Sequence, residues 1–527
     1  MNALTSRHVI SALAVACFVG MSSSALAQAK FSCPVKGGEF IFALEAKVPT
    51  YDQHVSTSAQ SRNVASLMFE SLITRDEKMQ PTLMLAESVN ESPDGLTYTF
   101  KIRQGVPFHN GKIMTSEDVV ASYERYRRVG VDKSMFGVID SFAAPDPSTF
   151  VIKMKQPQAI FLESFSNIAP PVVIIPKESA SAEQMQLPAI GTGPFQFVEF
   201  VADSHFKAKR FDGYKPNDSQ TGTNGLGGYK VACVDTVNFR MIVEPQARVA
   251  ALETGEVHGV EDVPRPSQKR LANNANIKFQ SMENFWVHLS YPNLSFPPTD
   301  NLKFRQAVQA ALDMDEIMEA SSDGLHRMDH ALQFPTSPYY SQAGKEHYNQ
   351  KNKDKAKKLL QEAGYKGEKV VLLTNKDYVA MYNASLVMAE QMKTVGINAE
   401  LLIHDWPAAL AKSVQETTGW NYFYTGWTTV VGQTGLPSLR NLTNPNNVHK
   451  PKNNQSDAQL MEFWNAGLNS KNLQDRVQYF AKAQQRIYDE ALALTFGVMP
   501  KVAATRANVE GFQNFFLPRA WNVSIKK

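Results

Sequence analysis

Residues 369–404 read KVVLLTNKDYVAMYNASLVMAEQMKTVGINAELLIH, and this stretch decides the fold class. Residues 370–374 are a short apolar run, typical of a buried strand. The apolar side chains that follow recur at helical spacing, and Gly396 stands where such a helix ends; they are Ala384, Val387, Met388, Met392 and Val395. Residues 397–403 alternate apolar and polar side chains, as a half-buried strand does. The stretch therefore predicts a βαβ unit.

Elements on both sides of this unit predict a mixed α/β protein. Residues 87–103 form a predicted hairpin around the turn Pro93-Asp94-Gly95, and residues 115–118 are a capping box that opens a helix. Further strands are expected at 38–44, 150–154 and 234–243, and further helices at 246–254, 304–312, 356–363 and 473–487. Residues 212–230 contain five Gly and predict a long surface loop. The order of elements indicates α/β lobes, one of them rich in hairpins.

The N-terminus has the pattern of a secretory signal peptide. Arg7 and His8 form a short basic region, and residues 9–20 carry no charge. This apolar run is shorter than the ~20 residues that a membrane span needs. Small residues then alternate up to Ala27 and Ala29, as signal peptidase requires. We therefore predict that residues 1–29 are a signal peptide and that the mature protein is periplasmic.

Composition excludes several classes of protein. The chain has 527 residues, 43% of them hydrophobic, with a net charge of +3. This balance gives no electrostatic footprint for nucleic acid or an anionic membrane. A prior of ~150 residues per domain predicts more than one domain. We expect a soluble, multidomain globular protein with no nucleic-acid partner.

No local motif predicts catalysis, a metal or a cofactor. The stretch from Gly105 to Lys112 has one residue too many for a phosphate-binding loop, and Ile113 stands where Ser or Thr is needed. His326 and His330 are four residues apart, but an exposed helix face explains them. We therefore predict a protein that is not an enzyme and has no cofactor or metal. The alternative is an exported hydrolase whose site is assembled from distant segments.

Aromatic residues gather in the second half of the chain. All six tryptophans fall after residue 280: Trp286, Trp406, Trp420, Trp427, Trp464 and Trp521. Several stand at the ends of predicted strands, where α/β sheets leave ligand crevices. Core packing is the alternative for each of them. The pattern favours an aromatic binding cleft.

Export of the protein would determine the state of its cysteines. Removal of the signal takes away Cys17 and leaves Cys33 and Cys233 in an oxidising compartment. Two cysteines permit one intramolecular bridge, and the alternative is two buried free thiols. We favour the disulfide, because exported proteins seldom keep unpaired thiols.

At the level of whole segments, the chain resembles a known family. The supporting stretches are 72–76, 85–88, 92–101, 108–111, 115–126, 191–195, 251–257, 304–308 and 355–365. Their order and spacing resemble the periplasmic solute-binding proteins of family 5, which serve dipeptide, oligopeptide and nickel ABC importers. The resemblance covers residues 38–500. It implies a receptor that closes on a small peptide-like or other organic solute and delivers it to an inner-membrane ABC permease.

The resemblance also implies the architecture. Members of this family have a type II-like periplasmic binding protein fold, with two lobes and an extra inserted domain. We expect a discontinuous first lobe at 30–62, 188–283 and 497–527, a hairpin-rich insertion at 63–187 and a second lobe at 284–496. The protein is expected to be a monomer. A chemoreceptor partner that signals, and does not deliver, is the alternative role.

The resemblance implies that strand ends and loops of the cleft hold the ligand. Our candidates for these positions are Trp427, Trp406, Trp286, Tyr424, Glu45, Thr428 and Gly191. Peptide-binding relatives use an Asp shortly after a Gly-Trp pair, but Gly426-Trp427 is followed by no Asp or Glu up to Ser456. Dipeptide binders hold the ligand carboxylate with an Arg near the start of the helix at Tyr378. In this sequence the nearest cation to that position is Lys376.

The charged residues between Thr417 and Ser456 bear on the charge of the ligand. They are Arg440, Lys450 and Lys452, with His449 titratable. Because a buried cation needs an acidic partner, we predict a neutral or anionic ligand. The alternative is that Glu45 or Asp52 supplies the missing acid.

Overall fold

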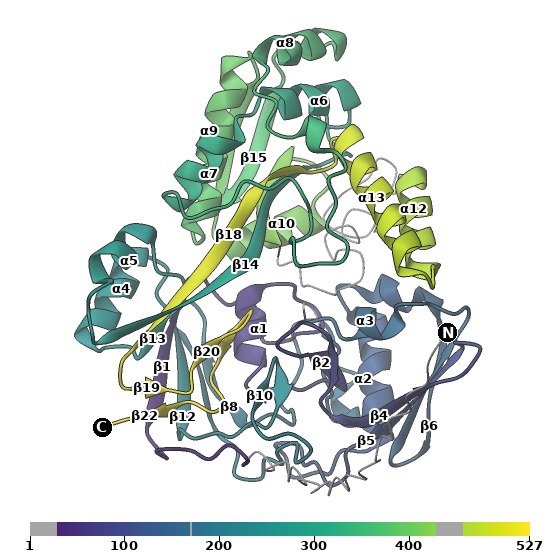
Figure 1. Cartoon of the computed structure of the whole chain (residues 1–527), viewed down its shortest axis with the longest axis vertical. Coiled ribbons are helices and arrows are strands. Elements are labelled where there is room, and N and C mark those ends of the chain that lie inside the picture. The colour runs from purple at the N-terminus through teal and green to yellow at the C-terminus, as the bar shows by residue number, and fades with distance from the viewer. Residues whose placement is uncertain (1–28, 169–170, 428–456) are drawn as a thin grey trace, which may run out of the picture.

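One large sheet runs through both lobes of the protein. The computed structural model describes residues 29–168, 171–427 and 457–527. Ten strands join in the order β16-β15-β17-β14-β18-β13-β1-β12-β9-β8. Figure 1 shows the first three strands in an upper lobe and the last five in a lower lobe, with β14 and β18 running between them. We use "upper lobe" for β15 to β17 and their helices, and "lower lobe" for β1, β8, β9, β12, β13 and theirs.

The lower lobe is built around β1, as the sequence predicted for residues 38–44. β1 pairs in parallel with β12, and β12 pairs antiparallel with β9. The helix α4 ends at Gly255, whose φ of 83° is the left-handed conformation that favours glycine. The elements are β1 (Glu39–Leu44), α1 (Ala59–Ala65), β8 (Phe195–Val201), β9 (His205–Arg210), β12 (Thr236–Met241), α4 (Pro245–Thr254), β13 (Gly259–Val260) and α5 (Arg265–Leu271).

The upper lobe contains the predicted βαβ unit. β15 pairs in parallel with β16, and α9 connects them. The elements are α6 (Leu302–Ala311), α7 (Met314–Ser322), α8 (Lys353–Glu362), β15 (Lys369–Asn375), α9 (Val379–Thr394), β16 (Asn398–His404), α10 (Trp406–Gln415), β17 (Tyr422–Trp427), α12 (Ala458–Asn469) and α13 (Leu473–Asp489). Buried side chains of this lobe, such as Phe304 and Leu373, belong to the largest hydrophobic cluster.

Two long strands connect the lobes. They are β14 (Ile277–Pro292) and β18 (Leu494–Arg506), which pair antiparallel. Their register shifts between the pairs Met282–Lys501 and Trp286–Met499. A bulge of this kind bends and twists a strand pair. Lys501 and Trp286 border this shift in register.

The predicted hairpin belongs to a separate four-stranded sheet in the order β4-β5-β7-β6. Gly95 closes the β4–β5 turn with a φ of 71°, and Thr115 and Asp118 form the capping box of α2. Aromatic side chains of α2 and β7 pack between them, as Tyr123 and Phe150 do at 4.9 Å. The elements are β4 (Ala86–Glu91), β5 (Thr97–Ile102), α2 (Ser116–Val129), β6 (Ile139–Asp146), β7 (Thr149–Met154) and α3 (Phe161–Phe165).

The remaining elements are short. They are β2 (Ile73–Arg75), β3 (Pro81–Leu83), β10 (Thr223–Asn224), β11 (Gly227–Gly228), β19 (Val509–Glu510), β20 (Gln513–Asn514), β21 (Pro518–Arg519), β22 (Ser524–Ile525) and the 3₁₀ turns η1 (Lys133–Val138), η2 (Lys177–Ser179) and η3 (Lys345–His347). The expectation of a wholly surface loop at 212–230 is wrong for its second part. Residues 225–228 and Lys230 are buried, because the backbone there packs against the backbone of Arg75.

Cys33 and Cys233 form the predicted disulfide, which joins the N-terminal segment to the segment before β12. The predicted signal peptide lies almost wholly in residues 1–28, outside the described residues. Within the described ranges, no helix has both the length and the apolar character to cross a bilayer.

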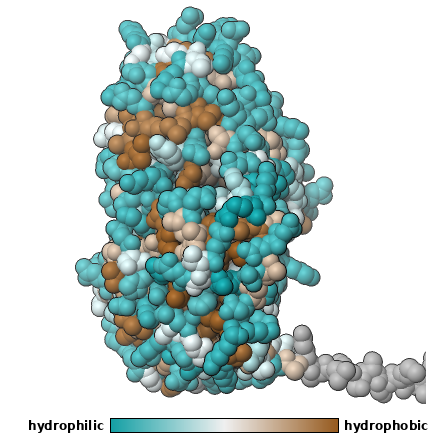
Figure 2. Space-filling model, turned by 90° about the vertical axis from the view of Figure 1, so that its left-hand side faces the viewer, coloured by the Kyte–Doolittle hydropathy of each residue, from teal (hydrophilic) through white to brown (hydrophobic). Residues whose placement is uncertain are grey.

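The face of the molecule that Figure 2 shows is mostly hydrophilic. Figure 2 shows one face of the molecule, on which apolar side chains gather most clearly in the upper half. Exposed apolar residues of the upper lobe include Val379 and Leu386 of α9 and Ile403 of β16. The generally polar surface agrees with the balanced charge of the chain.

Candidate ligand-binding cleft

Polar contacts among the described residues join the two lobes, including three between side chains. The indole Nε1 of Trp406, at the start of α10, donates to Ser58 Oγ at 3.3 Å. Gln60 Nε2 donates to the Tyr378 hydroxyl at 3.3 Å, and Lys47 Nζ lies 3.4 Å from Asp405 Oδ2. Ser58 is the N-cap of α1, so this short helix presents its first turn to the upper lobe. The lobes therefore stand in a closed arrangement.

Aromatic rings form the upper wall of the region between the lobes. The ring of Tyr378 lies edge-on to Trp286, with centroids 5.3 Å apart, and edge-on to Trp406 at 5.2 Å. Trp406 also stacks on Phe423 of β17, with centroids 6.2 Å apart. Tyr378 is held in place because its backbone N–H donates to Asn375 at the end of β15. Such rigid rings offer large contact area at low entropy cost.

A buried group of three charged side chains forms the lower wall. Lys501 Nζ lies 2.5 Å from Glu45 Oε1 and 2.5 Å from Glu261 Oε1. All three residues are at least 95% buried, and they come from β18, the end of β1 and the end of β13. The ammonium also lies over the ring of Trp286, 5.3 Å from its centroid. This ion trio thus touches the aromatic wall.

The pKa values in the trio move in opposite directions. Burial raises the pKa of Glu45 to about 8, against a smaller lowering by Lys501. Burial also acts to raise the pKa of Glu261, but Lys501 and Gln60 outweigh it and lower that pKa. Burial acts to lower the pKa of Lys501, but both acids raise it. At neutral pH the trio therefore carries a proton on Glu45 and no net charge.

The helix α1 supplies amides to the same wall. Gln60 Nε2 donates to Glu261 Oε2 at 2.8 Å, and Asn63 Nδ2 donates to Glu261 Oε1 at 3.1 Å. Arg62 lies on the same helix and is 4% exposed. The site therefore combines aromatic rings, amides, a neutralised acid pair and a guanidinium, with no nucleophile–base pair among these residues of the described chain.

Residues 80–448 match the sequence profile of the bacterial extracellular solute-binding proteins, family 5. The chain belongs to this family. A probable peptide ABC transporter periplasmic-binding protein of Sinorhizobium fredii, y4tO, is 27% identical over 91% of this chain and 92% of its own length. The glutathione-binding protein GsiB of Escherichia coli K12 is 25% identical over 91% and 93%.

Solved structures of other solute-binding proteins confirm the two-lobed fold. DppA of Helicobacter pylori in complex with the peptide STSA gives a TM-score of 0.81 at 20% identity, over 94% of this chain and 99% of that one. AgaA of A. tumefaciens R10 in complex with agropinic acid gives 0.80 at 22% identity, over 93% and 99%. The α/β fold class and the family resemblance are therefore confirmed.

The structure brings three of the predicted ligand residues of this solute-binding protein together. Trp286, Trp406 and Glu45 line the region between the lobes, as described above. Trp427 is half-buried and stacks on Tyr291, with centroids 5.9 Å apart. Their contact with a ligand stays a prediction.

Tyr424 lies deeper in the upper lobe. Its hydroxyl is 3.0 Å from His288 Nδ1, and its ring stacks on Phe496 at 5.2 Å. Burial lowers the pKa of His288 to about 3, so this imidazole is neutral at physiological pH. Tyr424 thus has a packing role besides its predicted one.

Two other predicted residues have partners elsewhere. A Cβ at Gly191 would lie 2.1 Å from the Met68 carbonyl oxygen, so only glycine fits against the turn that follows α1. Asp52, the alternative acid, pairs with Arg125 at 2.7 Å and is fully buried. It is therefore not free to receive a ligand cation. Thr428, Arg440, His449, Lys450 and Lys452 lie outside the described residues.

Residues between the lobes that were not predicted from sequence include Lys501, Glu261, Tyr378 and Arg62. A single signal was available for Tyr378, which follows the predicted strand at 370–374 and so lies at a strand end. Glu346, His347 and Asp489 place possible metal-ligand atoms within 4.8 Å of one another at the surface. Gln485 donates to Glu346 and Asp489, which accounts for this group without a metal.

Proposed function

We propose that this protein is the extracytoplasmic receptor subunit of an ABC importer, which binds a small solute between its lobes and delivers it to the permease. The observation that carries the proposal is the set of three contacts across the lobes, beside a cleft of aromatic rings and amides. A receptor that closes on its ligand needs these features. The family consists of solute-binding proteins, and we propose that this member, too, acts without catalysis.

We further propose that the ligand is a neutral or anionic organic solute, peptide-like in size. Of the two acids nearest the aromatic wall, Glu45 is protonated at neutral pH and Glu261 is neutralised by Lys501. A ligand ammonium would have to compete with Lys501 for them, at a desolvation cost of several kcal/mol per ion. Relatives named for a peptide and for glutathione support a small organic ligand.

We also propose the division of the chain predicted above, with Trp286, Trp406, Trp427 and Tyr424 as the aromatic part of the site. The two long strands β14 and β18 support a hinge near residues 283 and 497, because both run from one lobe to the other in Figure 1. Export through the predicted signal peptide and a monomeric state belong to the same proposal.

The experiment starts from the mature protein purified from its native host. Native mass spectrometry after gentle denaturation identifies the co-purified solute, and small-angle scattering compares the stripped and reloaded protein. We expect a smaller radius of gyration on reloading and no chemical change in the solute on prolonged incubation. Turnover of the solute, or the same radius with and without it, would contradict the proposal.

A further inference from the structure

Several buried arginines of the described chain have most of their N–H groups bonded, although Arg519, like Arg62, has a buried Nε without a partner. Arg248 donates to four backbone carbonyls, those of Ile242, Val243, Glu261 and Asp262. Arg125 donates to both carboxylate oxygens of Asp52 and to the carbonyls of Ala182 and Glu183. This is the expected pattern, because a buried guanidinium is costly unless its N–H groups are bonded.

Arg62 departs from this pattern. Among the described residues, its one hydrogen bond runs from Nη2 to the carbonyl of Phe516 at 3.4 Å, and its Nε is buried without a partner. No carboxylate of the described chain lies within ion-pair distance of it. Burial lowers the pKa of Arg62 to about 10, which still leaves the guanidinium protonated at pH 7. The protein thus buries a cation without providing its counter-ion.

The remainder of the chain cannot supply that counter-ion. Residues 1–28, 169–170 and 428–456 contain no Asp or Glu, so every acid of the protein is among the described residues. Glu261 is the acid that acts on the pKa of Arg62, but its two oxygens already accept from Lys501, Gln60, Asn63 and the Glu45 backbone. An anion from outside the chain is therefore the missing partner.

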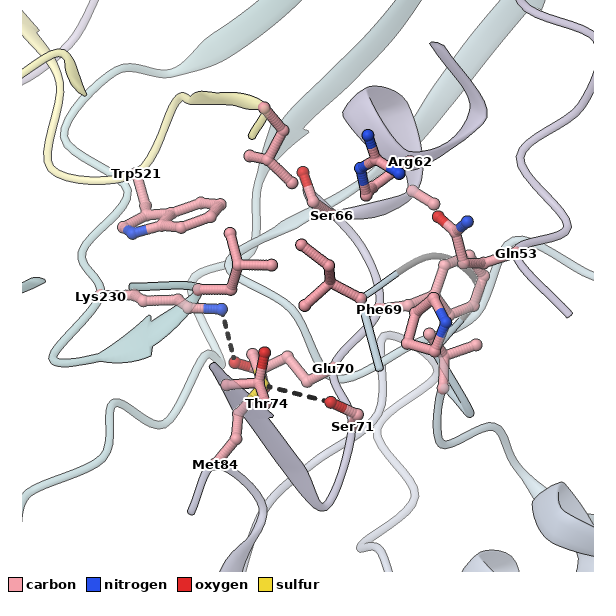
Figure 3. A pocket seen from close by; sticks show the side chains of 16 residues that line it. Gln53, Arg62, Ser66, Phe69, Glu70, Ser71, Thr74, Met84, Lys230 and Trp521 are labelled. Carbon is pink, nitrogen blue, oxygen red and sulfur yellow. Dashed lines mark hydrogen bonds and ion pairs between the residues drawn. The ribbon is translucent and has the colours of Figure 1, made fainter. Parts of the chain in front are cut away.

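A small cavity lies against Arg62. Its volume is about 50 Å³, and one face of α1 lines it through Arg62, Ala65 and Ser66. In Figure 3 the side chains of Arg62 and Gln53 lie on one side, and Lys230 with Glu70 lies on the other. Glu70 accepts from Lys230, Tyr214 and Thr192, so this pair is satisfied. The lining is largely apolar, through residues such as Phe69 and Val173, with Arg62 and Gln53 among its polar groups. A cavity of this size has room for a carboxylate group or a few waters.

We propose that Arg62 is an anion-binding residue, and that the cavity beside it receives a carboxylate of the transported solute. The planar guanidinium matches a carboxylate with two parallel hydrogen bonds, which Lys could not provide. Gln53 is the neighbouring amide that can complete the set. This inference rests on the proposed receptor function and narrows its ligand to carboxylate-bearing solutes.

The test uses formate as a minimal carboxylate and formamide as its neutral counterpart. Mature protein is stripped of ligand by unfolding and refolding, and the Tm is followed as each probe is added to about 100 mM. We expect formate to raise the Tm of the wild type by about 1–2 °C and formamide to leave it unchanged, as for a weak site occupied in the folded state only. Equal effects of formate and formamide on the wild type would overturn the proposal.

Variants assign the effect to one residue. In Arg62→Met and in Arg62→Gln the response to formate should disappear, and either variant suffices if the other does not fold. Arg240→Met, which removes a partly exposed arginine of β12, is the matched control and should respond like the wild type. A formate response that survives loss of Arg62 would overturn the proposal.

The same variants separate this inference from the proposed function. If the solute identified by native mass spectrometry binds Arg62→Met as tightly as the wild type, the anion site is wrong while the receptor function stands. We expect at least a tenfold loss of affinity instead, the size of a charge-assisted hydrogen bond. If no solute is bound and the lobes do not close, the receptor function fails whatever formate does.

Discussion

The indole N–H of Trp406 and the hydroxyl of Ser58 form a 3.3 Å hydrogen bond between the upper and the lower lobe. Ser58 Oγ also accepts from the backbone N–H of Gln60, and so caps α1. One hydroxyl therefore both starts the helix that lines the cleft and holds the lobes together. Closure and the local order of α1 are coupled through this residue.

A double-mutant cycle isolates this contact. Ser58→Ala and Trp406→Phe should each destabilise the closed protein, and their effects should be less than additive by about 1 kcal/mol, the net value of one hydrogen bond. Denaturant unfolding of the ligand-loaded protein measures the coupling. Ser66→Ala with Trp406→Phe is the control, because the Ser66 hydroxyl donates to the carbonyl of Asn63, within the lower lobe. Full additivity in the first cycle would contradict a stabilising contact across the lobes.

The raised pKa of Glu45 predicts a change of stability with pH. Folded protein keeps a proton on this residue up to about pH 8, whereas the unfolded chain releases it near 4.5. The contribution of Glu45 to stability is therefore complete below 4.5 and is lost as pH rises through about 8. The free energy of unfolding of Glu45→Gln, taken relative to that of wild type, should rise by about 1 kcal/mol or more between about pH 5.5 and pH 9. This is the value of roughly one pKa unit. Thermal unfolding at a series of pH values measures this.

Glu261 provides the check on that result. Its pKa is lowered, so its own contribution is lost at acid pH, below the range of the experiment. A constant difference between wild type and Glu45→Gln across the range would show that Glu45 is ionised throughout.

The aromatic wall predicts which tryptophans matter for binding. Trp286→Ala removes a ring that lies between Tyr378 and Lys501, and Trp427→Ala removes a half-buried ring. Each should weaken binding of the co-purified solute by about 1 kcal/mol or more, as for buried aromatic anchors. Isothermal titration measures the affinity. Trp464→Phe is the control, because Trp464 packs on Phe480 between α12 and α13. Unchanged affinity in both alanine variants would remove the aromatic site.

The disulfide predicts the thiol content and a stability difference. Denatured, unreduced mature protein should show no free thiol, because Cys33 and Cys233 are bonded. Cys33→Ala with Cys233→Ala opens a loop with a sequence separation of 200 and should cost about 2–4 kcal/mol, with ~5 kcal/mol as the chain-entropy limit. Urea unfolding of both forms measures the difference. Equal stability would show that the bridge does not constrain the unfolded chain.

Local sequence predicted much of the fold, for identifiable physical reasons. The βαβ unit at 369–404 and the hairpin around Gly95 are specified by periodicity and turn residues within a few turns of chain. Gly255 and Gly396 stand after helices with φ of 83° and 93°, values that glycine adopts without strain. The second part of the 212–230 loop was misjudged, because burial there comes from contact with Arg75, which no local pattern encodes.

The cleft was less predictable, because its groups meet only in three dimensions. Lys501 reaches Glu45 across a sequence separation of 456 and Glu261 across 240. Trp286 and Trp406 were predicted since aromatic residues at strand ends carry a local signal. Arg62 carries no local signal in the sequence, because it is distinguished by the lack of a counter-ion in the folded protein. Gly191 belongs to the stretch 191–195, which supports the family resemblance. The structure explains the glycine by its close packing against the backbone of Met68.

The ion trio permits a final prediction, in which losing one charge is worse than losing two. Lys501→Met leaves Glu261 ionised and buried without a cation, and should cost about 3–5 kcal/mol in the free energy of unfolding. Adding Glu261→Gln removes the stranded charge while its amide still accepts from Gln60 or Asn63. We expect the double variant to recover at least half of the loss, because apolar and amide groups need no counter-ion. Denaturant unfolding at neutral pH measures both variants against wild type. If the second substitution lowers stability further, Lys501 contributes mainly through its packing against Phe285 and Trp286, and not by neutralising the acids.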